Sequence, residues 1–302
     1  MSATFNPNNV LLSDVKSGNV PVEQGKAILK EVMSNSLIMQ LAQYEPMTKQ
    51  KKEFDVFLGG LGAYWVAEGE KIQTTQATWA KATMEAKKLG VIIPVSREYL
   101  TYKQADFFEF IKPMLAEALY RKFDQAVITG EDNPFEWSIK KSASGDRKIT
   151  GALSLTNYDK LVSALNDEGF EPNAFVSKVS NNPKLKGLVR DENGIKTSVY
   201  DSRAKALDGV PTFNVNNEIA EFKKGSLYAG DFNYARYGIP YNMTYAISED
   251  ATLSTIKGED GEPINLFERE LVALRVTMDV AFMIVKDEAF ATLDAAADST
   301  GK

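Results

Sequence analysis

Residues 272–285, Val-Ala-Leu-Arg-Val-Thr-Met-Asp-Val-Ala-Phe-Met-Ile-Val, are the stretch of this sequence that decides the fold. Apolar residues occupy every even-numbered position, whereas the odd-numbered positions carry a mixture that includes Arg, Thr and Asp. Because side chains alternate between the two faces of a strand, this pattern predicts one long strand with a buried face. Such a strand spans about 50 Å, so we expect it to bend or bulge part-way. The residues singled out on it are Leu274, Arg275, Val276 and Phe282.

A strand followed by a long helix is the second strong pattern. Alternating apolar residues over 89–95 predict the strand, and apolar residues at helical spacing predict a helix over about 104–128. Asp106 and Glu109 have capping-box spacing at its start, and Pro113 is expected to kink it. The predicted apolar face includes Met114. The residues singled out on this helix are Phe108, Ile111, Pro113, Leu115, Leu119 and Phe123.

Residues 54–84 predict a long two-stranded hairpin, with apolar ends around a glycine-rich and polar middle. An isolated ribbon of this length has no second layer against which to bury its aromatic residues, and it is marginal in water. It must therefore dock either on its own core or on a neighbouring subunit. The residues expected to make such a contact are Tyr64, Trp65, Glu68, Gly69, Glu70 and Lys71.

The remaining segments complete one interlocked α+β chain without internal repeats. Residues 1–36 form a polar arm that ends in a short helix, with Ile28, Leu29, Val32 and Met33 on one face, and residues 37–53 are expected to form a connecting strand. Residues 151–264 predict a compact α+β subdomain with helices at 156–166 and 183–189 and strands at 174–177, 210–215 and 243–247. After the long strand, Asp287 is expected to cap a short C-terminal helix.

Composition excludes much of common enzymology. The 302-residue chain contains neither His nor Cys, which removes Cys/His zinc sites, Ser-His-Asp and Cys-His nucleophile systems, and disulfides. Its net charge of −6 has the wrong sign for a protein that holds nucleic acid on a basic face. No leader peptide or membrane span is predicted. Glu68 and Glu70 form the best remaining carboxylate pair, but an exposed pair has no environment to shift its pKa. We therefore expect a protein without catalytic activity, cofactor or metal.

The order of these parts, together with several short motifs, resembles the tailed-phage major capsid protein family with the Hong Kong 97 type fold. The sequence is especially similar to members from phages of Gram-positive hosts. The resemblance extends from about Phe5 to Leu293. The residues that carry it are Ala63-Tyr64-Trp65-Val66-Ala67-Glu68-Gly69-Glu70-Lys71-Ile72, Lys88 to Ser96, Lys112-Pro113-Met114 through Phe123-Asp124, Asn265-Leu266-Phe267, Val272-Ala273-Leu274-Arg275 and Glu288-Ala289-Phe290.

The resemblance implies a division of the chain into parts with known names in that family. They are an N-arm with its short helix (1–36), a connecting strand (37–53), an E-loop (54–84), a P-domain with the spine helix (85–150), an A-domain (151–264), and a P-domain return strand with a C-terminal helix (265–302). In the family, E-loops and N-arms lie across neighbouring subunits, while A-domains meet at the centres of capsomers.

The implied function is structural: self-assembly into pentamers and hexamers of an icosahedral shell. The implied partners are further copies of the chain, a scaffolding protein, a portal protein and enclosed double-stranded DNA without sequence-specific binding, with no membrane. The implied location is the virion, after assembly in the bacterial host cytoplasm. Two alternatives stay open here, namely an encapsulin-like nanocompartment shell and, more distantly, a carboxylate-dependent hydrolase.

Overall fold

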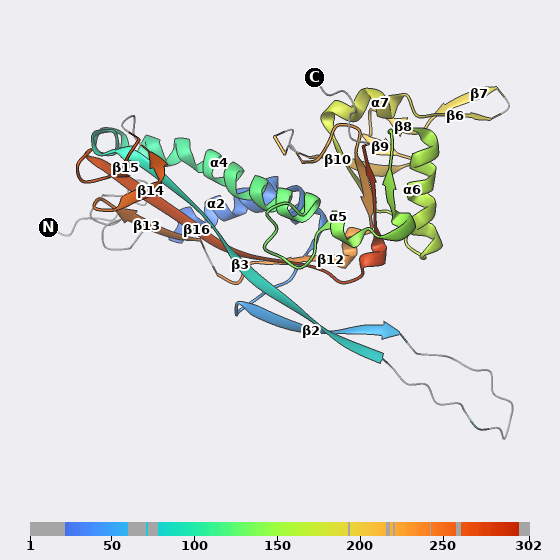
Figure 1. Cartoon of the computed structure of the whole chain (residues 1–302), viewed down its shortest axis with the longest axis horizontal. Helices are drawn as coiled ribbons and strands as arrows, with labels where there is room; N and C mark the ends of the chain where they lie inside the picture. The colour runs from blue at the N-terminus through green and yellow to red at the C-terminus, as the bar shows by residue number, and fades with distance from the viewer. Residues whose placement is uncertain are drawn as a thin grey trace.

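The computed structural model describes residues 22–59, 71, 78–192, 194–215, 218–219, 221–241, 243–257 and 261–295. Figure 1 shows an elongated molecule with a long helix beside one sheet at one end and a second sheet with its own helices at the other. A two-stranded hairpin leaves the body near its middle and points away from it. Among the described helices, none is both long and apolar enough to cross a membrane. The architecture is α+β, as the sequence predicts.

The first sheet is built from six strands: β1 (Gln43–Tyr44), β2 (Lys51–Gly59), β3 (Thr78–Ser96), β12 (Ala235–Gly238), β13 (Thr244–Ser248) and β16 (Leu271–Ile284). Strand β16 is central, with β3 along one edge and β12 and β13 along the other. The antiparallel ladder of β16 with β3 runs without a register shift from Leu271↔Ser96 to Ala281↔Ala86. Of the predicted bend or bulge, the bulge does not occur over this span, because the 19-residue β3 offers β16 an equally regular partner.

The two faces of β16 confirm the predicted alternation. All even-numbered residues from Val272 to Ile284 are buried in the main core. On the opposite face, Ala281 and Met283 are buried in a smaller cluster, whereas Arg275 is exposed. The mixed composition of the odd-numbered positions follows, because that face is covered at one end of the strand and open in its middle.

The long helix α4 spans Arg97–Thr129 and begins seven residues before the prediction. The chain passes from β3 into α4 without a loop, and the first N–H of the helix, on Arg97, donates to the carbonyl oxygen of Glu270. Asp106 therefore lies inside the helix, and the capping-box interpretation is wrong. The helix ends at Gly130, whose φ of 76° gives the left-handed conformation that favours glycine at this position.

Two shorter helices, α2 (Val22–Asn35) and α3 (Leu37–Leu41), precede the first sheet, and α2 packs on α4. Ile28 and Val32 of α2 are buried, which confirms the predicted apolar face. The predicted connecting strand over 37–53 is wrong in its first part, where α3 forms instead. At the start of α3 the Ser36 hydroxyl accepts the N–H of Met39 and so caps the helix.

The second sheet has seven strands in the order β4-β17-β11-β5-β10-β9-β8. Tyr158, Leu161 and Leu165 of its helix α6 are buried against this sheet, in one cluster with Phe175. Predicted helix 156–166 and predicted strands 174–177 and 210–215 are confirmed here. The bounds are β4 (Lys148–Thr150), β5 (Ala174–Lys178), β8 (Tyr200–Asp201), β9 (Ala206–Leu207), β10 (Val210–Val215), β11 (Leu227–Gly230), β17 (Phe290–Asp294), α5 (Ile139–Ser142), α6 (Leu155–Asp167) and α7 (Asn182–Lys186).

The predicted C-terminal helix is wrong. After a single 3-10 turn, η4 (Asp287–Ala289), the chain forms strand β17 between β4 and β11 in the second sheet. Phe290 and Leu293 are buried there, as are the two residues between them, because an interior strand is covered on both faces. Conversely, β12 and β13 fall within the predicted subdomain 151–264 but pair with β16 in the first sheet.

Small elements complete the molecule. Within the described residues, two hairpins lie outside the main sheets, one made by β6 with β7 and the other by β14 with β15. The bounds are β6 (Val189–Glu192), β7 (Ile195–Ser198), β14 (Thr252–Lys257), β15 (Pro263–Asn265), η1 (Gly145–Arg147), η2 (Val179–Asn181) and η3 (Phe232–Tyr234).

Candidate functional site

The hairpin of β2 and β3 is the part of the molecule that the sequence singles out for contact with other molecules. The two strands pair from Lys51↔Glu85 at the base to Gly59↔Thr78. The second half of β3 belongs to the first sheet, so one continuous strand carries the hairpin out of the body (Figure 1). Lys71 is exposed. The other predicted contact residues, Tyr64, Trp65, Glu68, Gly69 and Glu70, lie outside the described residues.

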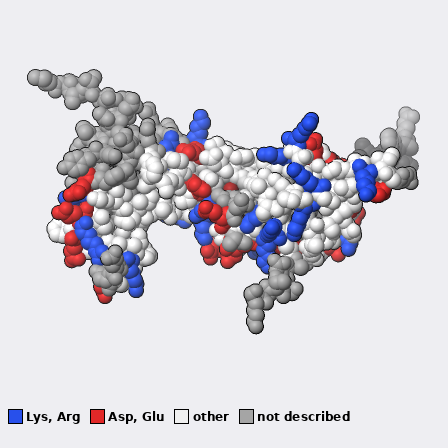
Figure 2. Space-filling model, turned by 90° about the horizontal axis from the view of Figure 1, so that it is seen from above, with Lys and Arg blue, Asp and Glu red and all other residues white. Residues whose placement is uncertain are grey.

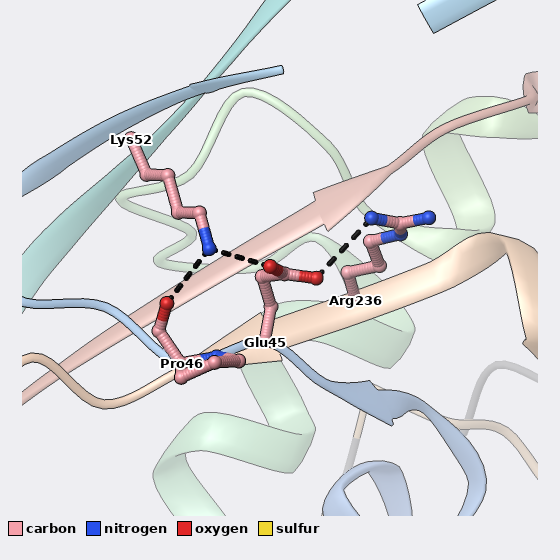
Figure 3. Close-up of polar contacts among 4 residues, drawn as sticks. All are labelled: Glu45, Pro46, Lys52 and Arg236. Carbon is pink, nitrogen blue, oxygen red and sulfur yellow. Dashed lines mark hydrogen bonds and ion pairs between the residues drawn. The ribbon is translucent and has the colours of Figure 1, made fainter. Parts of the chain in front are cut away.

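A carboxylate between two cations ties the base of the hairpin to the sheet (Figure 3). Glu45, directly after β1, accepts from Lys52 Nζ on β2 at 2.5 Å and from the Arg236 guanidinium on β12 at 3.2 Å. Lys52 also donates to the carbonyl oxygen of Pro46 at 2.8 Å. All three charged side chains are at least two-thirds buried. We call Glu45, Lys52 and Arg236 the ionic anchor.

The ionic anchor lies over a small apolar cluster. The ring of Phe54 on β2 has Lys52 Nζ 5.3 Å and Arg236 Cζ 5.5 Å from its centroid, which are cation–π distances. Beneath them, Met47 and Met84 are buried. A methyl group at Gly238 of β12 would lie 2.6 Å from Met47 Sδ and 2.8 Å from the carbonyl oxygen of Glu45, so only glycine fits. Charge and packing together fix how the hairpin leaves the body.

The residues singled out on the long helix are mostly core residues. Ile111, Leu115, Leu119 and Phe123 are buried, and the Phe123 ring meets that of Phe282 on β16 with centroids 6.3 Å apart. Pro113 is exposed, and Phe108 lies in the part of α4 whose side chains are outside the description. On β16, Leu274 and Val276 are buried with Phe282. These residues join α4 to the first sheet, and we call α4 and this sheet the platform.

An apolar groove on this platform was missed by the sequence analysis. It lies between β3 and α4, has a volume of ≈ 420 Å³, and presents almost only apolar atoms. Phe110 is 65% exposed and Met114 57% exposed, so the assignment of Met114 to the buried face is wrong. Phe110 and Met114 are four residues apart, so they lie on one side of the helix, next to the side that carries the buried residues Ile111 and Leu115. This spacing is the sequence signal for a second apolar face. The groove residues are Val91, Ile93, Val95, Phe110, Ile111, Met114, Leu115 and Ala118.

A buried carboxylate links α4 to the segment that precedes the sheet. Asp124 accepts from the Ser36 hydroxyl at 2.6 Å and from the N–H groups of Leu37 at 2.9 Å and Ile38 at 3.3 Å. Burial raises the pKa of Asp124 to about 7, against the lowering effect of these three hydrogen bonds. The carboxylate thus caps α3 from a distant helix, a role that no local sequence pattern indicates.

The described part of the chain offers no metal centre. Over those residues, there is no group of three or more acidic side chains arranged to hold a metal ion. Glu68 and Glu70, the pair considered for the hydrolase alternative, lie outside that part.

Comparison with known sequences identifies the family. The model of the phage capsid family matches residues 18–295. The chain is 47% identical to the major capsid protein of Staphylococcus phage 80alpha over 291 residues, which cover 96% of this chain and 89% of that protein. It is 24% identical to the probable major capsid protein of Mycobacterium phage D29, over 91% of this chain and 90% of that protein.

Comparison with solved structures supports the fold. A chain from Microbacterium phage Oxtober96 matches with a TM-score of 0.69 at 19% identity, over 86% of this chain and 91% of the other. A chain from the capsid of an empty GTA particle matches with a TM-score of 0.64 at 14% identity, over 98% and 94%. The α+β fold is thus of the Hong Kong 97 type, and the hydrolase alternative is wrong. The chain belongs to the phage capsid family, and it is a structural protein of the phage head, not an enzyme.

Proposed function

We propose that the chain assembles into pentamers and hexamers of a closed icosahedral shell, and that its hairpin makes the contact between subunits. The proposal rests on the hairpin because the described outer parts of β2 and β3 project from the body without a second layer (Figure 1). A contact of hairpin to platform joins two different surfaces of the same protein. Such head-to-tail contacts close into rings, and many weak contacts add up in a lattice.

The neighbour's apolar groove is the proposed landing site of the hairpin. Tyr64 and Trp65 lie in the segment between β2 and β3, and the hairpin needs an apolar surface for these aromatic residues. The groove supplies such a surface, with Phe110 and Met114 left open to solvent in the single subunit. Contact through Glu68, Gly69, Glu70 and Lys71 at the rim completes the proposed interface.

We apply the family's names for the parts of the subunit to the elements of the structure, with boundaries that differ from those predicted from the sequence. We assign the E-loop to the paired region from Lys51 to Glu85, and the P-domain to the first sheet with α4. The A-domain is then the second sheet, which takes in β4 and β17 and leaves β12 and β13 to the P-domain. The N-arm is assigned to residues 1–36.

Further partners belong to the same proposal. We infer a scaffolding protein that guides assembly, a portal protein at one vertex, and double-stranded DNA inside, with assembly in the host cytoplasm. The support is membership of the phage capsid family, together with a 47% identical relative from a phage of Staphylococcus. That relative also favours a phage head over an encapsulin-like compartment.

Deletion of the hairpin tip tests the proposal. Residues 60–77 are replaced by Asn-Gly, which favours a tight turn between paired strands. We expect a folded subunit with an unchanged melting temperature that forms no shells by size-exclusion chromatography and electron microscopy. A matched deletion removes residues 191–196 from the hairpin of β6 and β7 and is expected to leave shells intact. Normal shells from the 60–77 deletion would contradict the proposal.

A further inference from the structure

Five lysines lie at one end of the second sheet. They belong to two chain segments, one from the end of β5 through α7 and the other directly before β11. Lys178 ends β5, Lys184 and Lys186 lie on α7, and Lys223 and Lys224 lie in the loop before β11. We call these five residues the lysine face. Figure 2 views the molecule from the side of α7, and Lys and Arg side chains gather over this part with few Asp or Glu between them.

A buried asparagine holds the two segments together. Asn181 is fully buried; its side-chain oxygen accepts the N–H of Gly225 at 2.7 Å, and its amide donates to the carbonyl oxygen of Ser226 at 2.9 Å. A methyl group at Gly225 would lie 3.6 Å from Lys184 Nζ, so the ammonium group of α7 lies against the second loop. These contacts therefore hold the backbone directly after Lys223 and Lys224 in place and set Lys184 beside it.

The charge of this face opposes that of the whole protein. The chain carries a net charge of −6, yet Lys184, Lys186, Lys223 and Lys224 are all exposed here. Lys178 is largely buried, and burial lowers its pKa while the nearby Glu221 acts in the opposite direction. Like charges held together repel one another, and a bound polyanion relieves that repulsion.

We propose that the lysine face binds the phosphate backbone of the double-stranded DNA enclosed by the shell; this inference rests on the proposed function. Lysines act as point charges on phosphates, and such contacts require neither sequence nor apolar complementarity. A protein partner would favour an apolar core, and the groove between β3 and α4 contains none of these lysines. In Figure 1, α7 lies on the side of the body opposite to the hairpin, so DNA contact does not compete with the hairpin contact.

The expected signature is a strong dependence of affinity on salt. With about four phosphates neutralised by the exposed lysines, the slope of log K against log salt is about −3.6. A fourfold rise in salt then weakens binding about 150-fold. Each subunit binds weakly, but many copies lining one shell act together.

Fluorescence anisotropy of a labelled duplex with the full-length unassembled protein measures this slope. The test variant carries Lys184→Gln, Lys186→Gln, Lys223→Gln and Lys224→Gln. The control variant carries the same change at four exposed lysines outside the face and outside the hairpin, namely Lys49, Lys88, Lys148 and Lys257. The two variants have equal net charge, and circular dichroism verifies that each is folded.

We expect the test variant to lose at least about 30-fold in affinity at low salt, with a slope reduced by about 3.6, and the control to stay within about threefold of the unmodified protein. Equal losses in the two variants would overturn the proposal, since only net charge would then matter. Unchanged DNA affinity in a test variant that no longer forms shells would also overturn it, in favour of a protein contact. Electron microscopy of shells tests the proposed function separately, because shell formation and DNA affinity are independent readouts.

Discussion

Replacing Glu45 by alanine tests how the hairpin is held to the body. The change removes the acceptor of two charge-assisted hydrogen bonds, from Lys52 and from Arg236. Arg236 then keeps its contact with the Phe54 ring, but its Nε atom already has no hydrogen-bond partner and is buried. Lys52 retains the carbonyl oxygen of Pro46. Two partly buried cations are thus left beside each other without their shared carboxylate.

The expected loss follows from these contacts. A hydrogen bond to a charged group contributes about 1.5–3 kcal/mol to the free energy of unfolding. Removing the bond is more destabilising when it leaves a partly buried charge without a partner. Because Lys52 and Arg236 are about a third exposed, at 33% and 32%, solvent compensates part of this effect. We expect the free energy of unfolding to fall by about 2–3 kcal/mol, which corresponds to a melting temperature lower by about 4–6 °C.

Thermal denaturation and hydrogen exchange measure the loss and its location. Exchange is expected to accelerate at the N–H of Glu45, which donates to the carbonyl oxygen of Tyr237, and at the N–H of Ala86, which donates to that of Gln50. Glu53→Ala is the matched control, since Glu53 is an exposed glutamate on β2 next to Lys52. A loss in Glu45→Ala below about 0.5 kcal/mol, or equal to that of the control, would refute the ionic anchor.

Three further predictions concern the buried carboxylate, the glycine under the anchor and the groove. Burial raises the pKa of Asp124 from 3.8 to about 7, so the native state holds a proton that the unfolded chain has released. Stability from this group is therefore largest below about pH 4 and declines as pH rises to about 7, by up to about 4 kcal/mol; urea titrations should find this decline absent in Asp124→Asn, and equal pH slopes would contradict it. Gly238→Ala should lower the free energy of unfolding by about 1–3 kcal/mol in the same titrations, because its methyl group meets Met47 and the backbone of Glu45, and an unchanged value would disprove the close packing. Phe110→Asp should leave stability within about 0.5 kcal/mol but reduce shell yield in sucrose gradients, whereas the equally exposed Ile195→Asp should not; equal yields would exclude the groove as a landing site.

Sequence patterns predicted the elements whose stability is set by long periodic runs. The alternation of Val272 to Ile284 predicted β16 and its buried face, and helical spacing from Ile111 to Phe123 predicted the core face of α4. The hairpin was predicted from the contrast between its apolar ends and its glycine-rich middle. In each case, many residues repeat the same signal.

Elements fixed by distant partners were missed. Strand β17 is a short run buried on both faces, and such a run has no period that distinguishes a strand from a helix. The helix α3 depends on Asp124, which lies on α4, and the start of α4 is held by the backbone of Glu270. The groove and the lysine face likewise arise only when separate segments are brought together, so no single window of sequence contains them.

The hairpin contact is measured most directly by electron cryomicroscopy of shells assembled from this protein. We predict that the hairpin of each subunit, from Lys51 to Glu85, lies across a neighbour and covers its groove at Phe110 and Met114. Hairpins folded back on their own subunit, or standing free in solvent with the groove empty, would contradict the account.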